Sequence, residues 1–229
     1  MNYGKKGVRA KQKALNSKSQ KWGRKLALTC VKIMLAGVAA GIGVFRGILS
    51  STPTIRLSDV VAVGEATIVY DKEGNEIDQY VSTNSNRLSV GMDEIPDYMG
   101  KAFVAIEDER FYQHNGIDVK GILRAGYQFI KTGGEEAQGA STITQQLLKN
   151  TVFTDWTSEG SNKIKKIKRK IQEQYLALEI TKYYSKDEIL LRYMNAINLG
   201  QNTLGVESAS LRYFGKHCSD LTLSECAVI

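Results

Sequence analysis

The chain has 229 residues, of which 42% are hydrophobic and 24% charged, with 21 glycines and only 2 prolines. This composition excludes a collagen-like or intrinsically disordered protein and fits a globular domain of ordinary size. The three cysteines, Cys30, Cys218 and Cys226, are too few and too scattered for a disulfide framework or a four-ligand zinc site. Metal-thiolate and thiol-redox functions are therefore disfavoured.

The net charge of +7 comes from the N-terminus. Nine of the 31 basic residues, and no acidic residue, lie in residues 1–25, so the remaining 22 basic residues face 24 acidic ones. The excess of positive charge is therefore a property of a basic tail, not of the rest of the chain.

An apolar segment, residues 26–49, follows this tail directly. It exceeds the roughly 20 residues that a transmembrane helix needs, and its two charges, Lys32 and Arg46, lie near its ends. A buried helix of a soluble domain and a cleaved signal peptide are the alternatives, but a signal peptide has a shorter apolar region of about 7 to 15 residues. The basic flank favours an uncleaved single-pass anchor in the cell membrane, with a cytoplasmic N-terminus. The remainder then lies outside the cytoplasm, and nucleic acid is not expected as a partner.

We therefore divide the chain into a basic tail (1–25), an anchor (26–49), a connector (50–95) and a C-terminal domain (96–229). Within the connector, residues 66–82 alternate around Gly74-Asn75, which predicts a β-hairpin that we describe as a small β stalk. Beyond residue 95 the spacing of apolar residues is helical, and polar caps mark several helix starts. The predicted helices are 97–110, 117–131, 142–152, 162–182, 186–197, 203–214 and one from 222 onward.

The first candidate functional segment is EDERFYQHNGID, residues 107–118. Glu107 ends an apolar helical run and is followed by Phe111 and Tyr112, so we expect its carboxyl to be partly desolvated. Desolvation raises a carboxyl pKa toward the range of a general base. The alternative is a set of solvated acids at a helix end.

The second candidate segment covers residues 133–150, in which a glycine-rich mobile loop precedes a helix that Thr142 caps together with Gln145. The free amides at such a helix start receive anions such as phosphate. Gln145, Gln146, Lys149 and Asn150 add further donors. A well-capped surface helix without a ligand explains the same pattern.

The third candidate segment covers residues 163–180. Its apolar residues recur at helical spacing and predict a buried stripe, formed by Ile164, Ile167, Ile171, Tyr175 and Leu178. Lys165, Arg169 and Glu173 follow one another at intervals of four, which gives either a solvated charge row or a cationic wall for pyrophosphate.

Five blocks, in this order, resemble the glycosyltransferase domain of family 51, the peptidoglycan polymerase module of bifunctional penicillin-binding proteins and monofunctional transglycosylases. The resemblance covers residues 66–229, and its blocks are EDERFYQHNGID, GASTITQQLLKN, RKIQEQYLALEI, KDEILLRYMNAINLG and GVESASLRYFGKHCSDLTLSECAVI.

Leu191 and Asn198 depart from the family, which usually has an acid at the first position and often a Tyr at the second. The polar stretch 153–162 looks longer than usual. No SxxK transpeptidase motif is present, and the chain ends within the expected last helix. A fragment of a longer two-domain protein and a chain without a penicillin-binding half therefore both stay open.

The resemblance implies a mainly α, lysozyme-like transglycosylase domain with a small β stalk and an N-terminal transmembrane helix. It implies polymerisation of lipid II into glycan strands at the outer face of the membrane, with undecaprenyl pyrophosphate as leaving group. Its expected partners are lipid II, the growing strand, membrane lipid and other cell-wall synthesis proteins. No cofactor is certain. A divalent cation, Mg²⁺ or Mn²⁺, could bind at the pyrophosphate, but the sequence shows no dedicated metal site.

The resemblance also implies site residues. The implied catalytic residues are Glu107 and Glu173, and the implied substrate-binding residues are Lys149, Lys165, Arg169, Gln145, Gln146, Ser141 and Thr142.

This hypothesis requires Glu107 and Glu173 to face one open cleft. Asn195, Tyr213 and Lys216 are further candidates for the cleft, for which structural roles fit equally. A lysozyme-like hydrolase, which transfers the sugar to water, and a catalytically silent membrane scaffold are the rival functions.

Overall fold

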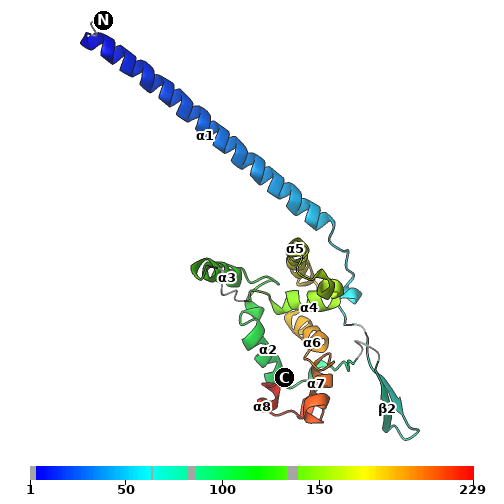
Figure 1. Cartoon of the computed structure of the whole chain (residues 1–229). Coiled ribbons are helices and arrows are strands. Elements are labelled where there is room, and N and C mark those ends of the chain that lie inside the picture. Colours follow the sequence, from blue (N-terminus) through cyan, green and yellow to red (C-terminus); the bar gives the residue numbers. More distant parts are fainter. Residues whose placement is uncertain (1–3, 63, 82–85, 134–138) are drawn as a thin grey trace. The chain divides into compact units, whose positions relative to one another are not determined.

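The computed structural model describes residues 4–62, 64–81, 86–133 and 139–229 (Figure 1). Residues 134–138, which form much of the predicted glycine-rich loop, and residue 82 at the end of the predicted hairpin lie outside the described residues. The chain forms two compact units, Met1–Thr52 and Pro53–Ile229. The boundaries proposed from the sequence within these units stay predictions.

The first unit is a single helix, α1 (Lys5–Ser50). Its part Lys21–Ser50 contains an 18-residue window with a mean hydropathy of 2.0 and is long and apolar enough to cross a membrane, as the sequence predicted for residues 26–49. The helix begins at Lys5, so the basic tail is helical too. Its orientation across a bilayer stays a prediction.

The predicted β-hairpin is confirmed as β1 (Thr67–Tyr70) paired antiparallel with β2 (Glu76–Tyr80). Asp71 closes the turn, because its carboxylate accepts from the backbone N–H of Asn75 at 2.8 Å. Gly74 adopts a φ of +88°, a conformation that glycine adopts without steric cost.

The predicted helices are confirmed in their order. They are α2 (Asp97–Glu107), α3 (Val119–Lys131), α4 (Ile143–Thr151), α5 (Lys163–Ile180), α6 (Lys186–Ala196), α7 (Val206–Phe214) and α8 (Leu223–Cys226). Capping boxes at Ser185 and Thr222 start α6 and α8 as predicted. Thr142 caps α4 by accepting from the N–H of Gln145, but the side-chain nitrogen of Gln145 has no hydrogen-bond partner in the described part of the chain.

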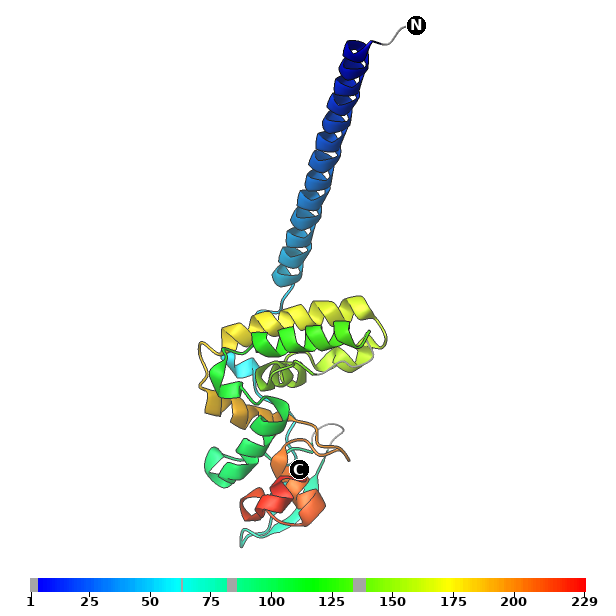
Figure 2. The ribbon, with the colours of Figure 1, turned by 90° about the vertical axis from the view of Figure 1, so that its left-hand side faces the viewer.

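The core of the second unit is centred on α4, which packs against α5 and α6. Ile143, Leu147 and Leu148 of α4 are fully buried, as are Tyr193 and Met194 of α6. Figures 1 and 2 show α3 and α5 at one end of this unit and α7 and α8 at the other. The helices therefore provide the rigid frame from which the candidate site residues project.

The prediction that the apolar stripe of α5 is buried is wrong at most of its positions. Ile164 and Ile167 are 79% and 59% exposed, and Tyr175 and Leu178 are also exposed. Helical periodicity identifies an apolar face but does not tell what covers it. The residues that α5 buries are instead Gln172, Glu173, Leu176, Ala177 and Ile180. α3 is similarly apolar and exposed, at Val119, Leu123, Tyr127, Phe129 and Ile130.

We predict that Leu147→Ala lowers the free energy of unfolding of the second unit by about 2–5 kcal/mol, because it empties a fully buried position. Ile164→Ala is the matched control and should change it by less than about 0.5 kcal/mol, because that side chain is exposed. Denaturant unfolding of both variants measures the difference. Equal losses would contradict this description of the core.

A second prediction concerns Glu225 of α8, whose pKa is lowered from 4.5 to about 2 by Lys216 at 2.8 Å and by the N–H and hydroxyl of Thr222. A lowered pKa in the folded state means that the carboxylate contributes stability above about pH 4.5 and loses it as the pH falls toward 2. The stability difference between the wild-type protein and Glu225→Gln should therefore shrink over this window. A difference that is constant with pH would show that the ion pair contributes nothing.

Candidate active site

The buried carboxylate at the end of α2 is Asp108, whereas the sequence predicted a desolvated Glu107. Glu107 is exposed, and Asp108 is only 7% exposed. Both carboxylate oxygens of Asp108 lie within 3.0 Å of His114 Nε2, and Oδ2 accepts from the backbone N–H of Ile143 at 3.1 Å. The helix ends at Glu107, and the next residue turns inward. Asp108 thus joins the end of α2 to the first turn of α4.

Glu107 is held by a hydrogen-bonded chain from the core. Gln146 Nε2 donates to Glu107 Oε2 at 2.8 Å, and the hydroxyl of Tyr193 donates to Gln146 Oε1 at 3.3 Å. Burial and the negative charge of Glu107 raise the pKa of Tyr193, so this phenol stays protonated. Tyr193 was not predicted from the sequence, although a tyrosine on the inner face of a predicted helix needs a partner for its hydroxyl.

Glu107 lines a small pocket of about 160 Å³ together with Ser141 and Thr142. Arg110 and Arg124 also line it. Arg110 is paired with Asp118 at 2.5 Å, which fixes its guanidinium at the edge of the pocket. Three residues predicted from two separate sequence segments are therefore brought together here.

A second, basic pocket of about 380 Å³ contains Lys165 and Arg169, together with Lys168, Gln172 and Trp156. The ammonium of Lys149 lies 3.7 Å from the centre of the Trp156 ring. Lys165 and Arg169 thus line one pocket, and Lys149 contacts the Trp156 ring of that pocket. Trp156 was missed, because the polar stretch that carries it offered no periodic signal.

Glu173 does not face an open cleft, contrary to the expectation from the sequence. Its side chain is fully buried and bonded to Arg169 and to Lys170, whose Nζ lies 2.8 Å from Glu173 Oε2. A carboxylate within a helix bundle needs such partners, because an uncompensated buried charge is costly. Lys170, three residues before Glu173, was not singled out in the sequence.

Lys170 also connects the two pockets. Its ammonium donates to Ser141 Oγ at 2.8 Å, while it contacts Glu173 on the other side. Ser141 lines the pocket of Glu107, and Arg169, the other partner of Glu173, lines the basic pocket. A continuous polar chain therefore runs between them.

Two other predicted substrate contacts are buried at the start of α4. Gln145 is 1% exposed and Thr142 is 1% exposed. The Thr142 hydroxyl donates to the carbonyl of Gly116 at 2.7 Å and accepts from the N–H of Gln145. Thr142 thus caps the helix start, and neither side chain is presented to solvent.

The three weaker candidates have structural partners. The Asn195 side chain bonds the backbone N–H and carbonyl of Val90 at 3.1 and 2.9 Å. The hydroxyl of Tyr213 donates to the carbonyl of Leu199, and Lys216 pairs with Glu225. These contacts support the structural alternative for all three.

In comparison with known proteins, the transglycosylase family matches residues 73–229. The chain belongs to the transglycosylase family. It is 43% identical over 205 residues to penicillin-binding protein 1A of Clostridium perfringens strain 13, a match that covers 87% of this chain and 29% of the relative. It is 39% identical over 204 residues to penicillin-binding protein 1A of Escherichia coli K12, covering 89% of this chain and 22% of the relative. This transglycosylase chain therefore spans less than a third of the length of these relatives, and the resemblance found in the sequence is confirmed.

The part of the chain that the structure describes forms no ready-made cation site. Within the described residues, no three His, Cys, Asp or Glu side chains are grouped to hold a metal ion. The carboxylates of Asp108 and Glu173 are already engaged by His114 and by two cations. These donors do not fit Mg²⁺ or Mn²⁺, so a cation bound to the pyrophosphate itself stays a prediction.

We predict that Glu173→Gln destabilises the transglycosylase domain by about 3–5 kcal/mol, because it leaves Arg169 and Lys170 without their buried counter-charge. Glu179→Gln, on the same helix, is the control. It removes the half-exposed partner of Lys182 and should cost less than about 1 kcal/mol. The comparison is made by denaturant unfolding, and a small loss for Glu173→Gln would refute the buried ion-pair assignment.

Proposed function

We propose that this transglycosylase is a peptidoglycan glycosyltransferase that polymerises lipid II into glycan strands, with undecaprenyl pyrophosphate as leaving group. The observation that carries the proposal is the arrangement of an exposed, hydrogen-bonded Glu107 in one pocket and a basic pocket joined to it through Ser141 and Lys170. Membership of the family and similarity to proteins named penicillin-binding protein 1A support it.

In this proposal Glu107 is the general base. It takes the proton from the 4-hydroxyl of one lipid II as that oxygen attacks the reducing-end sugar of the growing strand. The Tyr193 hydroxyl donates to Gln146 Oε1, and so the amide N–H₂ of Gln146 is turned toward Glu107 and holds the carboxylate in place. A positioned base of this kind contributes about 10² to 10⁴ in rate.

The basic pocket would receive the departing pyrophosphate. Lys165 and Arg169 line this pocket, and Lys149 contacts its Trp156. Cations already held in place stabilise developing negative charge without reorganisation. Because Glu173 is buried beneath Arg169 and Lys170, we assign it the role of holding these cations rather than of contacting the sugar.

The remaining residues that were predicted to contact substrate differ in how buried they are. Ser141 and Gln146 are partly exposed and are proposed to contact substrate, whereas the buried Thr142 and Gln145 orient the first turn of α4. Such orientation matters, because small displacements of reacting groups lower rates strongly.

We also propose that the transglycosylase works at the outer face of the cell membrane. The apolar part of α1 would anchor it in a single pass with the N-terminus in the cytoplasm. The exposed apolar residues of α3 and α5 lie at one end of the second unit, where they would contact membrane lipid (Figures 1 and 2). Other cell-wall synthesis proteins are proposed as partners at the same surface of the cell.

The basic pocket distinguishes this proposal from its rivals. A hydrolase that transfers sugar to water has no need for clustered cations beside its carboxylate. A silent scaffold has no need for the hydrogen-bonded chain that holds Glu107. Incubation of the protein with labelled lipid II separates the three functions, since they give long glycan strands, hydrolysed sugar or no turnover.

We predict that Glu107→Gln lowers polymerisation of lipid II at least about a hundredfold, because the amide keeps the shape but cannot take the proton. Glu73→Gln is the control, since Glu73 is an exposed carboxylate in the hairpin turn, outside both pockets, and pairs with Lys72 at 3.4 Å. It should retain nearly full activity, and both variants should keep the wild-type melting temperature. Near-normal turnover by Glu107→Gln would remove Glu107 from the mechanism.

A further inference from the structure

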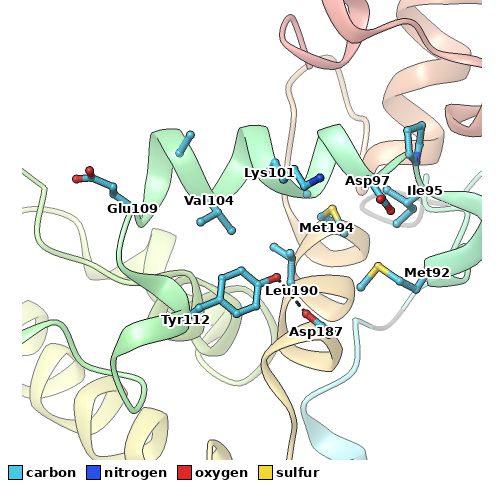
Figure 3. A pocket seen from close by; sticks show the side chains of 13 residues that line it. Met92, Ile95, Asp97, Lys101, Val104, Glu109, Tyr112, Asp187, Leu190 and Met194 are labelled. Carbon is cyan, nitrogen blue, oxygen red and sulfur yellow. Dashed lines mark hydrogen bonds between the residues drawn. The ribbon is translucent and has the colours of Figure 1, made fainter.

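The first turn of α6 contains a buried ammonium that the proposed mechanism does not use. Lys186 Nζ is inaccessible to solvent and has no hydrogen-bond partner among the described residues. It lies 4.3 Å from the centre of the Phe111 ring. The next residue, Asp187, accepts a hydrogen bond from the Tyr112 hydroxyl at 3.0 Å, as Figure 3 shows at one side of the pocket between α2 and α6. The start of α6 therefore contacts the segment that directly follows Glu107.

A buried ammonium without hydrogen bonds destabilises a fold unless other charges compensate it. Burial lowers the pKa of Lys186, and the negative charge of Asp108 opposes this shift. The face of an aromatic ring attracts a cation and supplies the second compensation. The Lys186 ammonium is thus attracted by the Asp108 carboxylate and by the Phe111 ring. Each attraction also acts on the partner, and so favours the positions of Asp108 and Phe111.

Asp108 and Phe111 are connected to the proposed base, Glu107, through their contacts. The fully buried Phe111 ring lies edge-on to His114, with 6.3 Å between ring centres, and His114 bonds the carboxylate of Asp108. Asp108 follows Glu107 directly and also binds the backbone N–H of Ile143 in α4. Any shift of Asp108 therefore moves Glu107 relative to Gln146, which lies one turn further along α4.

We propose that Lys186 is a positioning residue for the transfer reaction. Its buried charge holds Phe111 and Asp108 and so fixes the end of α2 from which Glu107 projects. The inference rests on the proposed function, in which Glu107 is the base. Lys186 itself does not contact the substrate or take part in proton transfer.

The test uses Lys186→Met in the full chain, because methionine has a similar length and removes only the charge and its solvation cost. With lipid II as substrate, kcat should fall at least about tenfold while KM changes less than about twofold, since the base is displaced and the basic pocket is intact. The melting temperature should change little, because removal of the buried ammonium's desolvation cost offsets the lost attraction to Asp108. Lys186→Arg, which keeps the charge, should recover part of kcat.

Lys182→Met is the matched control. Lys182 is an exposed lysine, paired only with Glu179 in the described structure, and its substitution should leave kcat unchanged. Wild-type kcat in Lys186→Met would overturn the inference. A loss of kcat that follows a lowered melting temperature, without recovery in Lys186→Arg, would overturn it in favour of a purely structural role.

Hydrogen exchange provides a readout that does not depend on activity. The Ile143 amide donates to Asp108, so its exchange should be faster in Lys186→Met than in the wild-type protein. Unchanged exchange at Ile143 would contradict the inference. Absence of lipid II turnover by the wild-type protein would instead refute the proposed function, and the exchange measurement would still decide the position of Asp108.

Discussion

The architecture of the site depends on one buried carboxylate. Asp108 ends the hydrogen bonding of α2, binds His114 and caps the backbone of α4 at Ile143. A charge in a low-dielectric interior is tolerated only where several donors surround it, which makes its position well defined. Because Asp108 is directed inward, the preceding Glu107 is left at the surface, within reach of Gln146.

A second buried charge organises the cationic side of the site. Glu173 is fully buried between Arg169 and Lys170, and Lys170 extends to Ser141. One negative charge thus holds two positive ones, of which Arg169 lines the basic pocket and Lys170 contacts Ser141. Such a network is ordered before any ligand arrives, and this is the condition under which electrostatic stabilisation contributes most to catalysis.

Local signals predicted the hairpin and the helices, because the Gly74-Asn75 turn, the Ser185 and Thr222 caps and the apolar spacing act over a few residues. The same local signals do not show that Glu107, Ser141 and Thr142 belong to one site. Only the family resemblance implied this. The burial of Glu173 and the exposure of Ile164 could not be predicted, since an α-helical period does not tell which face meets another element. Tyr193 and Lys170 were missed for a related reason: their partners lie 47 and 29 residues away in the chain.

The exposed apolar residues of α3 and α5 affect how this protein behaves during purification. Residues such as Leu123, Ile130 and Ile164 are exposed on the second unit itself, separately from α1. Removal of α1 would therefore not yield a domain suited to plain buffer, because a broad apolar surface would still be exposed to water. Detergent micelles would bind the shortened protein, and purification without detergent would favour self-association through these helices.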